Sequence, residues 1–162
     1  VRAAGVSGAA RLKPMMQLHF DETKVLVYAR RGDTLLVFEE PDCPQVLTQV
    51  PGGTVEPGET PREAAFREFS EETGFAIAPP LHGLGVQQHR YEHDGRLIRH
   101  ERHCFAFDAP DDLPAEWHHV EGQPSQGDPV LFRLFWIPIA EARLRLGYAM
   151  SEMLSDPFFQ PR

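Results

Sequence analysis

The 162-residue sequence has few of the features that mark secreted, membrane-spanning or nucleic-acid-binding chains. Its two cysteines, Cys43 and Cys104, are too few for a disulfide framework, and no apolar run approaches the roughly 20 residues that cross a bilayer. Positive charge is also scarce: 16 Lys and Arg face 24 Asp and Glu, and a net charge of −8 disfavours the phosphate backbone of a nucleic-acid polymer. We therefore predict a cytoplasmic protein that has neither a membrane nor a nucleic-acid polymer as its partner.

The N-terminal residues lack the apolar central segment of a secretory signal. We predict a flexible tail over residues 1–17, one globular domain over 18–150 and a C-terminal extension over 151–162. An apolar fraction of 41% is enough for one sizeable core in a chain of this length.

Runs of branched and aromatic residues separated by turn signals predict a framework of β-strands. The pairs Gly32-Asp33 and Asp94-Gly95 indicate the turns of two hairpins. The predicted strands are 24–30, 34–39, 45–50, 85–92, 96–107 and 130–139. Proline and glycine predict an irregular loop over 51–58, a long loop is expected over 109–128, and a second helix within 139–154 is expected to break near Gly147.

A helix between these strands has clear start and stop signals. Thr60 is predicted to be its N-cap, Pro61 suits the first helical position, and Glu63 completes a Thr-x-x-Glu capping box. Gly74 is predicted to end the helix, because glycine readily adopts the left-handed conformation found at that position.

Three glutamates lie on one face of this helix, beside its apolar stripe. Glu68 and Glu72 are like charges four residues apart, and Glu71 and Glu72 lie at the negative end of the helix dipole. Each effect costs tenths of a kcal/mol to about one. A solvated acidic face is the simplest alternative, but clustered carboxylates beside a glycine-rich loop favour a site for Mg²⁺ or Mn²⁺.

The same stretch resembles a known family motif. Gly53, Glu59 and the run from Arg67 to Phe75 match the Nudix box, GX5EX7REUXEEXGU with U apolar, at every defined position. The resemblance is to the MutT-like Nudix hydrolases and implies an α/β/α sandwich with a mixed β-sheet between helices. It also implies hydrolysis of a phosphoanhydride in a nucleoside diphosphate linked to another moiety, through metal-activated water attack on phosphorus.

The resemblance further assigns roles to residues of the box and its loop. Glu68, Glu71 and Glu72 are implied metal ligands together with the backbone carbonyl of Gly52, and Glu68 is the candidate base. The implied catalytic set is these three glutamates with Arg67, which orients carboxylates. The implied supporting residues are Gly53, Glu59 and Gly74. A further carboxylate outside the box is expected, and the sequence leaves four candidates: Glu92, Glu101, Glu116 and Glu121.

Several alternatives stay open at this level. A ligand-binding module without catalysis keeps the same fold, and the diphosphate could belong to a non-nucleotide such as an inositol pyrophosphate or a prenyl diphosphate. A homodimer is also an open alternative. A zinc site at residues 100–104 is disfavoured, because its His-Glu-x-His spacing lies in a strand pattern. Candidates for phosphate contacts are Arg90, Arg96, Arg99 and Arg102, and those for stacking on a base are Tyr91, Phe105 and Trp117, with His118 and His119 beside it.

Overall fold

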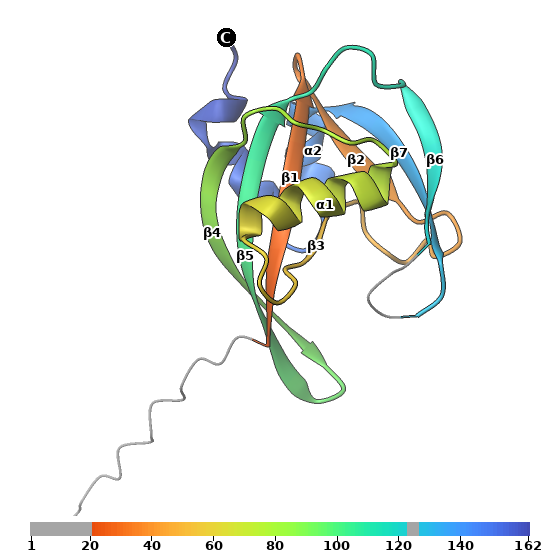
Figure 1. Cartoon of the computed structure of the whole chain (residues 1–162), viewed down its shortest axis with the longest axis vertical. Helices are drawn as coiled ribbons and strands as arrows, with labels where there is room; N and C mark the ends of the chain where they lie inside the picture. The colour runs from red at the N-terminus through yellow and green to blue at the C-terminus, as the bar shows by residue number, and fades with distance from the viewer. Residues whose placement is uncertain (1–20, 123–126) are drawn as a thin grey trace, which may run out of the picture.

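In the computed structural model, residues 21–122 and 127–162 are described, so the predicted tail over 1–17 lies outside them. The described residues form a seven-stranded mixed sheet with the strand order β4-β5-β1-β2-β7-β6, and β3 pairs with β1 beside this path (Figure 1). The strands are β1 (Glu22–Arg31), β2 (Thr34–Glu39), β3 (Gly52–Thr54), β4 (His82–His93), β5 (Arg96–Asp108), β6 (Glu116–Glu121) and β7 (Val130–Pro138).

Helices cover both faces of this sheet, so that its central strand is apolar on both sides. On one face, α1 (Pro61–Thr73) buries Ala65 and Phe69 against Val25 and Val27 of β1. The other face is covered by α2 (Ile139–Arg145) and two short 3-10 helices, η1 (Met150–Ser155) and η2 (Pro157–Phe159). The predicted α/β class and the sandwich with a mixed central sheet are confirmed.

Strand β1 runs parallel to β5 and antiparallel to β2 and β3. Both predicted hairpin regions form strands, with Gly32 and Gly95 at positive φ in the turns. The second helix ends at Arg145, before Gly147, and the chain resumes as the 3-10 helix η1. Within the described residues, no helix is long and apolar enough to span a membrane.

Two local predictions for the segment between β2 and α1 are wrong. Residues 45–50 form only an isolated bridge between Gln49 and Phe38, because the Val46 amide closes a turn onto the Cys43 carbonyl and the Leu47 amide donates to the Tyr148 hydroxyl. Gly52–Thr54, predicted to be irregular, is strand β3. Glycine is required there, since a Cβ on Gly52 would lie 2.3 Å from the backbone oxygen of Val25.

The predicted loop over 109–128 contains strand β6 at the edge of the sheet. Its residues alternate between exposed and half-buried positions, so it lacks the strong apolar pattern of the central strands. The inward positions include Trp117 and His119, which face α1. This strand brings a second segment of the chain to the acidic face of the helix.

Candidate metal centre

The three glutamates are held by a helix that is fixed at both ends. The Thr60 side chain accepts a hydrogen bond from the Glu63 amide, and the Glu63 carboxylate accepts one from the Thr60 amide. At the other end, Gly74 has φ 81° and donates its amide to the Ser70 carbonyl. The predicted capping box and glycine C-cap are confirmed, and they set the position of α1 along the sheet.

Strand β3 approaches the helix so closely that the carboxylates lie against its backbone. A Cβ on Gly53 would lie 2.2 Å from the Cδ atom of Glu68, so only glycine leaves room for this carboxylate. The Gly52 amide donates a 2.9 Å hydrogen bond to Oε2 of Glu72. Glu68 and Glu72 are therefore both buried, with 6% and 7% of their surfaces exposed.

Arg67 links the loop to the acidic face. Its Nε and Nη2 atoms form a two-pronged contact with the Glu59 carboxylate at 2.8 and 2.9 Å, and Nη2 also donates to the Thr54 carbonyl at 2.9 Å. Its Nη1 donates to Glu68 at 2.8 Å and to Glu71 at 3.1 Å. Hydrogen bonding to Arg67 holds the pKa of Glu59 below its usual value. Arg67 thus orients carboxylates, as the resemblance implied.

Of the four candidates for a further carboxylate, the structure brings Glu121 to the helix. Glu68, Glu71 and Glu121 each offer an oxygen within 4.8 Å of the other two, and no other group of at least three acids, histidines or cysteines is this close within residues 21–122 and 127–162. Glu101 instead contacts His103 at 2.8 Å, and Glu116 pairs with Arg133 at 2.6 Å. Glu92 lies exposed near the tip of the β4–β5 hairpin.

Two contacts fix β6 against the last turn of α1. Trp117 donates its indole N–H to the Thr73 carbonyl at 2.8 Å, and Nε2 of His119 donates to the Glu71 carbonyl at 2.9 Å. Trp117 also packs edge-on against Phe75, with ring centroids 5.3 Å apart. These contacts satisfy carbonyls left open at the helix end. Trp117 is therefore part of the scaffold and does not line the cavity beside the acids.

The carboxylates are electrostatically unfavourable in the absence of a cation. Burial raises the pKa of Glu68 to about 7, and repulsion by Glu71 and Glu121 adds to this effect while Arg67 opposes it. Burial also raises the pKa of Glu72 well above its ordinary value and raises that of Glu121. Glu40, which follows β2, raises the pKa of both Glu72 and Glu121 by charge repulsion. Glu40 is not among the candidate residues that the sequence indicates.

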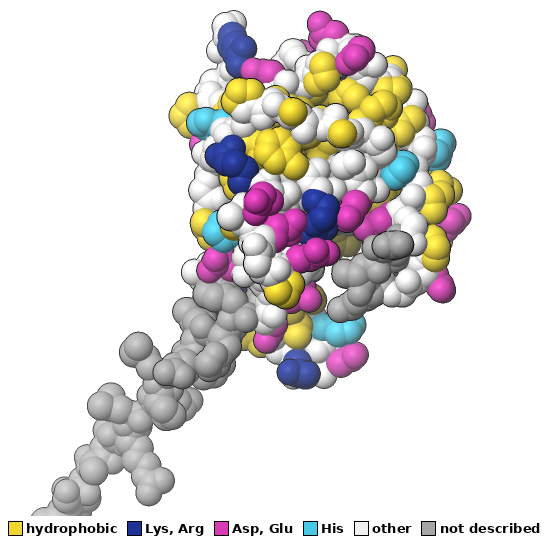
Figure 2. Space-filling view, in the orientation of Figure 1, with side chains coloured by type: hydrophobic (Ala, Val, Ile, Leu, Met, Phe, Trp, Pro, Cys, Tyr) yellow, Lys and Arg dark blue, Asp and Glu magenta, His cyan; other side chains and the backbone are white. Residues whose placement is uncertain are grey.

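The acidic cluster opens into a cavity of about 750 Å³. Figure 2 shows acidic side chains gathered across the middle of the face over α1. The wall facing the cluster comes from β1 and the β4–β5 hairpin, with Lys24, Tyr91, Arg96, Ile98 and His100. Dense carboxylate oxygens next to an open cavity suit a hard divalent cation such as Mg²⁺.

The other arginines singled out in the sequence lie in different places. Arg96 lines the cavity, whereas Arg102 is buried on the face covered by η1 and donates to the Tyr148 carbonyl at 2.6 Å. Arg99 is also buried, and its amide donates to Asp21. Arg90 is exposed on β4 and does not line the cavity. Of the four, Arg96 alone is placed to contact a ligand beside the acids.

Phe105 lies away from the acidic cluster, and of residues 100–104, where a zinc site is disfavoured, His100 alone lines the cavity. Phe105 packs partly buried in the core beneath α1, with the Arg62 guanidinium 5.4 Å from its ring centroid, so it does not line the cavity. The pKa of the buried Cys104 thiol is raised to about 12. Among the described residues, His100, His103 and Cys104 do not come together as a group that could hold a metal ion.

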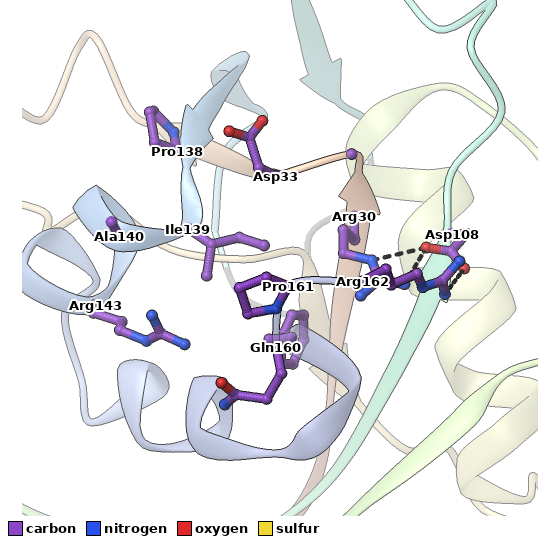
Figure 3. Close-up of a pocket in the computed structure, with 12 residues that line it drawn as sticks. Arg30, Asp33, Asp108, Pro138, Ile139, Ala140, Arg143, Gln160, Pro161 and Arg162 are labelled. Carbon is purple, nitrogen blue, oxygen red and sulfur yellow. Dashed lines mark hydrogen bonds and ion pairs between the residues drawn. The ribbon is translucent and has the colours of Figure 1, made fainter.

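A second cavity, of about 520 Å³, lies where the β1–β2 turn meets α2 and the C-terminal segment (Figure 3). Arg30 and Arg162 both pair with Asp108 there, at 2.7 Å each. Its floor includes Ile139 and Phe159. Because three arginines and two aspartates line it and it has no cluster of carboxylates, it is unsuited to the same cation chemistry.

The chain matches the NUDIX domain model over residues 19–156, and it belongs to that family. Enzymes of this family hydrolyse pyrophosphate bonds and generally use divalent metals. The predicted family membership is thus confirmed.

Individual relatives agree with this assignment. The chain is 30% identical to MutT4 of Mycobacterium tuberculosis over 112 residues, which are 69% of this chain and 41% of that protein. It is 29% identical to the NAD-capped RNA hydrolase NudC of Stutzerimonas stutzeri over 126 residues, 76% of this chain and 42% of that one. The chain therefore spans about two fifths of the length of these relatives.

The fold also matches a solved structure. The MutT NUDIX hydrolase from Burkholderia pseudomallei superimposes with a TM-score of 0.63 at 20% identity, covering 84% of this chain and 97% of that one. At this identity the similarity supports the fold alone.

Proposed function

We propose that the chain is a Mg²⁺- or Mn²⁺-dependent hydrolase that cleaves a phosphoanhydride in a nucleoside diphosphate linked to another moiety. The observation that carries the proposal is the convergence of Glu68 and Glu71 with Glu121, from a distant strand, next to the buried Glu72. Buried carboxylates with raised pKa values are costly unless a cation compensates them. The name of the NudC relative supports a nucleotide as the substrate class.

The donor set suits a hard cation. Glu68, Glu71, Glu72 and Glu121 supply carboxylate oxygens, and the Gly52 carbonyl is the proposed backbone ligand, in agreement with the preference of Mg²⁺ for oxygen. A bound divalent cation neutralises phosphate oxygens and lowers the pKa of a water molecule.

The residues themselves divide the remaining work. Arg67 donates a hydrogen bond to Oε1 of Glu68, which leaves Oε2 as the oxygen that can take a proton from the attacking water. Glu59 and Arg67 keep the Glu68 carboxylate in one orientation, and Gly53 leaves the space it occupies.

The test is hydrolysis of a panel of phosphoanhydrides with Mg²⁺ or Mn²⁺. The panel contains nucleoside triphosphates, nucleotide sugars, dinucleoside polyphosphates, NADH, ADP-ribose and coenzyme A, with an inositol pyrophosphate and a prenyl diphosphate as non-nucleotide substrates. We expect turnover of at least one nucleotide by the parent and loss of at least a hundredfold in Glu72→Gln, while Glu92→Gln, which lies outside the cavity, keeps parental turnover.

Two results would contradict the proposal. No hydrolysis of any compound with either metal would favour a ligand-binding module without catalysis. Turnover of the inositol pyrophosphate or the prenyl diphosphate alone would show that the chain is a hydrolase whose substrate is not a nucleotide.

A further inference from the structure

The cavity wall opposite the acidic cluster includes the rings of Tyr91, His93 and His100. Tyr91 of β4 pairs with Ile98 of β5, and His89 pairs with His100. The Tyr91 and His100 rings meet edge to face with centroids 5.2 Å apart, and the His89 ring stacks on Tyr91 at 5.8 Å. Tyr91 is 40% exposed, so part of its ring is open to the cavity.

The His100 ring of this wall is polar but carries no charge near neutral pH. Burial and the nearby Lys24 lower the pKa of His100 to about 4, so its imidazole is neutral near pH 7. Lys24 lies between this wall and the glycine-rich strand, since its ammonium is 2.6 Å from Glu22 and donates to the Thr54 hydroxyl at 2.6 Å. A ligand with one group bound on these rings would thus pass Lys24 and Thr54 before it reaches the acidic cluster.

The charges along the cavity restrict what can bind there. The basic lining residues, histidine apart, are Lys24, Arg67 and Arg96. Arg67 is engaged with four glutamates and Lys24 with one. A ligand with many phosphates would therefore lack cationic partners. Few apolar side chains line the cavity, so a long hydrocarbon chain would also be poorly accommodated.

We propose that Tyr91, Ile98 and His100 form the subsite for the nucleobase of the substrate, which stacks on the exposed ring of Tyr91 while its diphosphate reaches the acidic cluster past Lys24. A planar, polar ring matches a wall of aromatic faces with neutral polar edges, and stacking on such rings is favourable for every base. This inference deepens the proposed function and rests on it for the identity of the substrate class.

The test measures binding, so that it does not depend on turnover. AMP, GMP, CMP and UMP are titrated into the protein with Mg²⁺ in a calorimeter, and ribose 5-phosphate serves as the probe without a base. We expect the parent to bind at least one nucleotide about tenfold more tightly than ribose 5-phosphate, in line with the contribution of one base stacked on an aromatic ring.

Variants of the hairpin then locate the subsite. Tyr91→Leu should lose the tenfold preference for the nucleotide while binding ribose 5-phosphate like the parent, and Tyr91→Phe should retain the preference. Ile98→Ala should weaken nucleotide binding, whereas Leu97→Ala is the matched control, because Leu97 is 47% exposed on the same strand and does not line the cavity. Melting curves confirm that each variant is folded.

Two kinds of result overturn the subsite. One is a parent that binds none of the four nucleotides, or binds them no more tightly than ribose 5-phosphate. The other is a folded Tyr91→Leu protein that binds nucleotide like Leu97→Ala. Nucleotide preference without hydrolysis of any compound would retain the subsite and remove the proposed activity. Hydrolysis of a nucleotide of the panel without any preference for nucleotides over ribose 5-phosphate in binding would retain the activity and remove the subsite.

Discussion

Without divalent metal, the buried Glu68 carboxylate should make the protein less stable as the pH rises. Its pKa in the folded protein is about 7, against an ordinary value of 4.5. A group with a raised folded pKa contributes its full stability below the unfolded value and loses it as the pH passes through the folded value. The difference corresponds to about 3 kcal/mol, because each pKa unit is worth about 1.4 kcal/mol. Most of this loss should fall between pH 5 and pH 8.

Substitution by glutamine isolates this contribution. Glu68→Gln can still accept the Arg67 hydrogen bond but cannot ionise, so its stability should change less between pH 5 and pH 8. In a chelating buffer at pH 8, we expect the variant to exceed the parent in free energy of unfolding by up to about 3 kcal/mol, and at pH 5 by less than about 1 kcal/mol. Urea unfolding at four pH values measures both differences.

Glu92→Gln is the matched control, because Glu92 is exposed and lies outside the cavity. It should follow the parent at every pH. The reasoning would be refuted if the parent and Glu68→Gln showed the same pH dependence in chelator, or if Glu68→Gln were the less stable protein at pH 8. Either result would mean that Arg67 compensates Glu68 fully and that no cation is needed for that purpose.

Three further outcomes are expected. Glu121→Gln should lower kcat by at least tenfold in steady-state assays with Mg²⁺ while Glu92→Gln does not, and equal rates would remove Glu121 from the site. Mg²⁺ should raise the Tm of the parent more than that of Glu72→Gln in thermal melts, because a ligand bound only by the native state stabilises it, and identical shifts would count against this ligand. Gly53→Ala should displace the Glu68 carboxylate, because the new Cβ would lie 2.2 Å from Cδ of Glu68. Both turnover and the Mg²⁺-dependent rise in Tm should therefore fall. An unchanged rise in Tm would show that β3 can move away.

Local signals predicted the helix and its caps because they depend on neighbours in the sequence. Thr60 and Glu63, three positions apart, exchange the hydrogen bonds of the capping box, and Gly74 ends the helix by adopting a φ of 81°. The errors fall where structure depends on distant partners. Strand β3 exists because Gly52 can approach the backbone of β1, which no local propensity reports. The prolines and glycines of that segment indicated a loop, and tertiary pairing overrode them.

The choice of Glu121 among four carboxylates has the same origin. In an edge strand, alternate side chains share a face, so Trp117, His119 and Glu121 all point toward α1. The first two fix the strand to the carbonyls of Thr73 and Glu71, and the third then lies beside the helix glutamates. The pattern Trp-x-His-x-Glu carries this information only once β6 is known to lie next to the end of α1. Because α1 packs on β1 and β6 is joined to β1 through β7 and β2, the box encodes the helix half of the candidate site, and the fold supplies the other half.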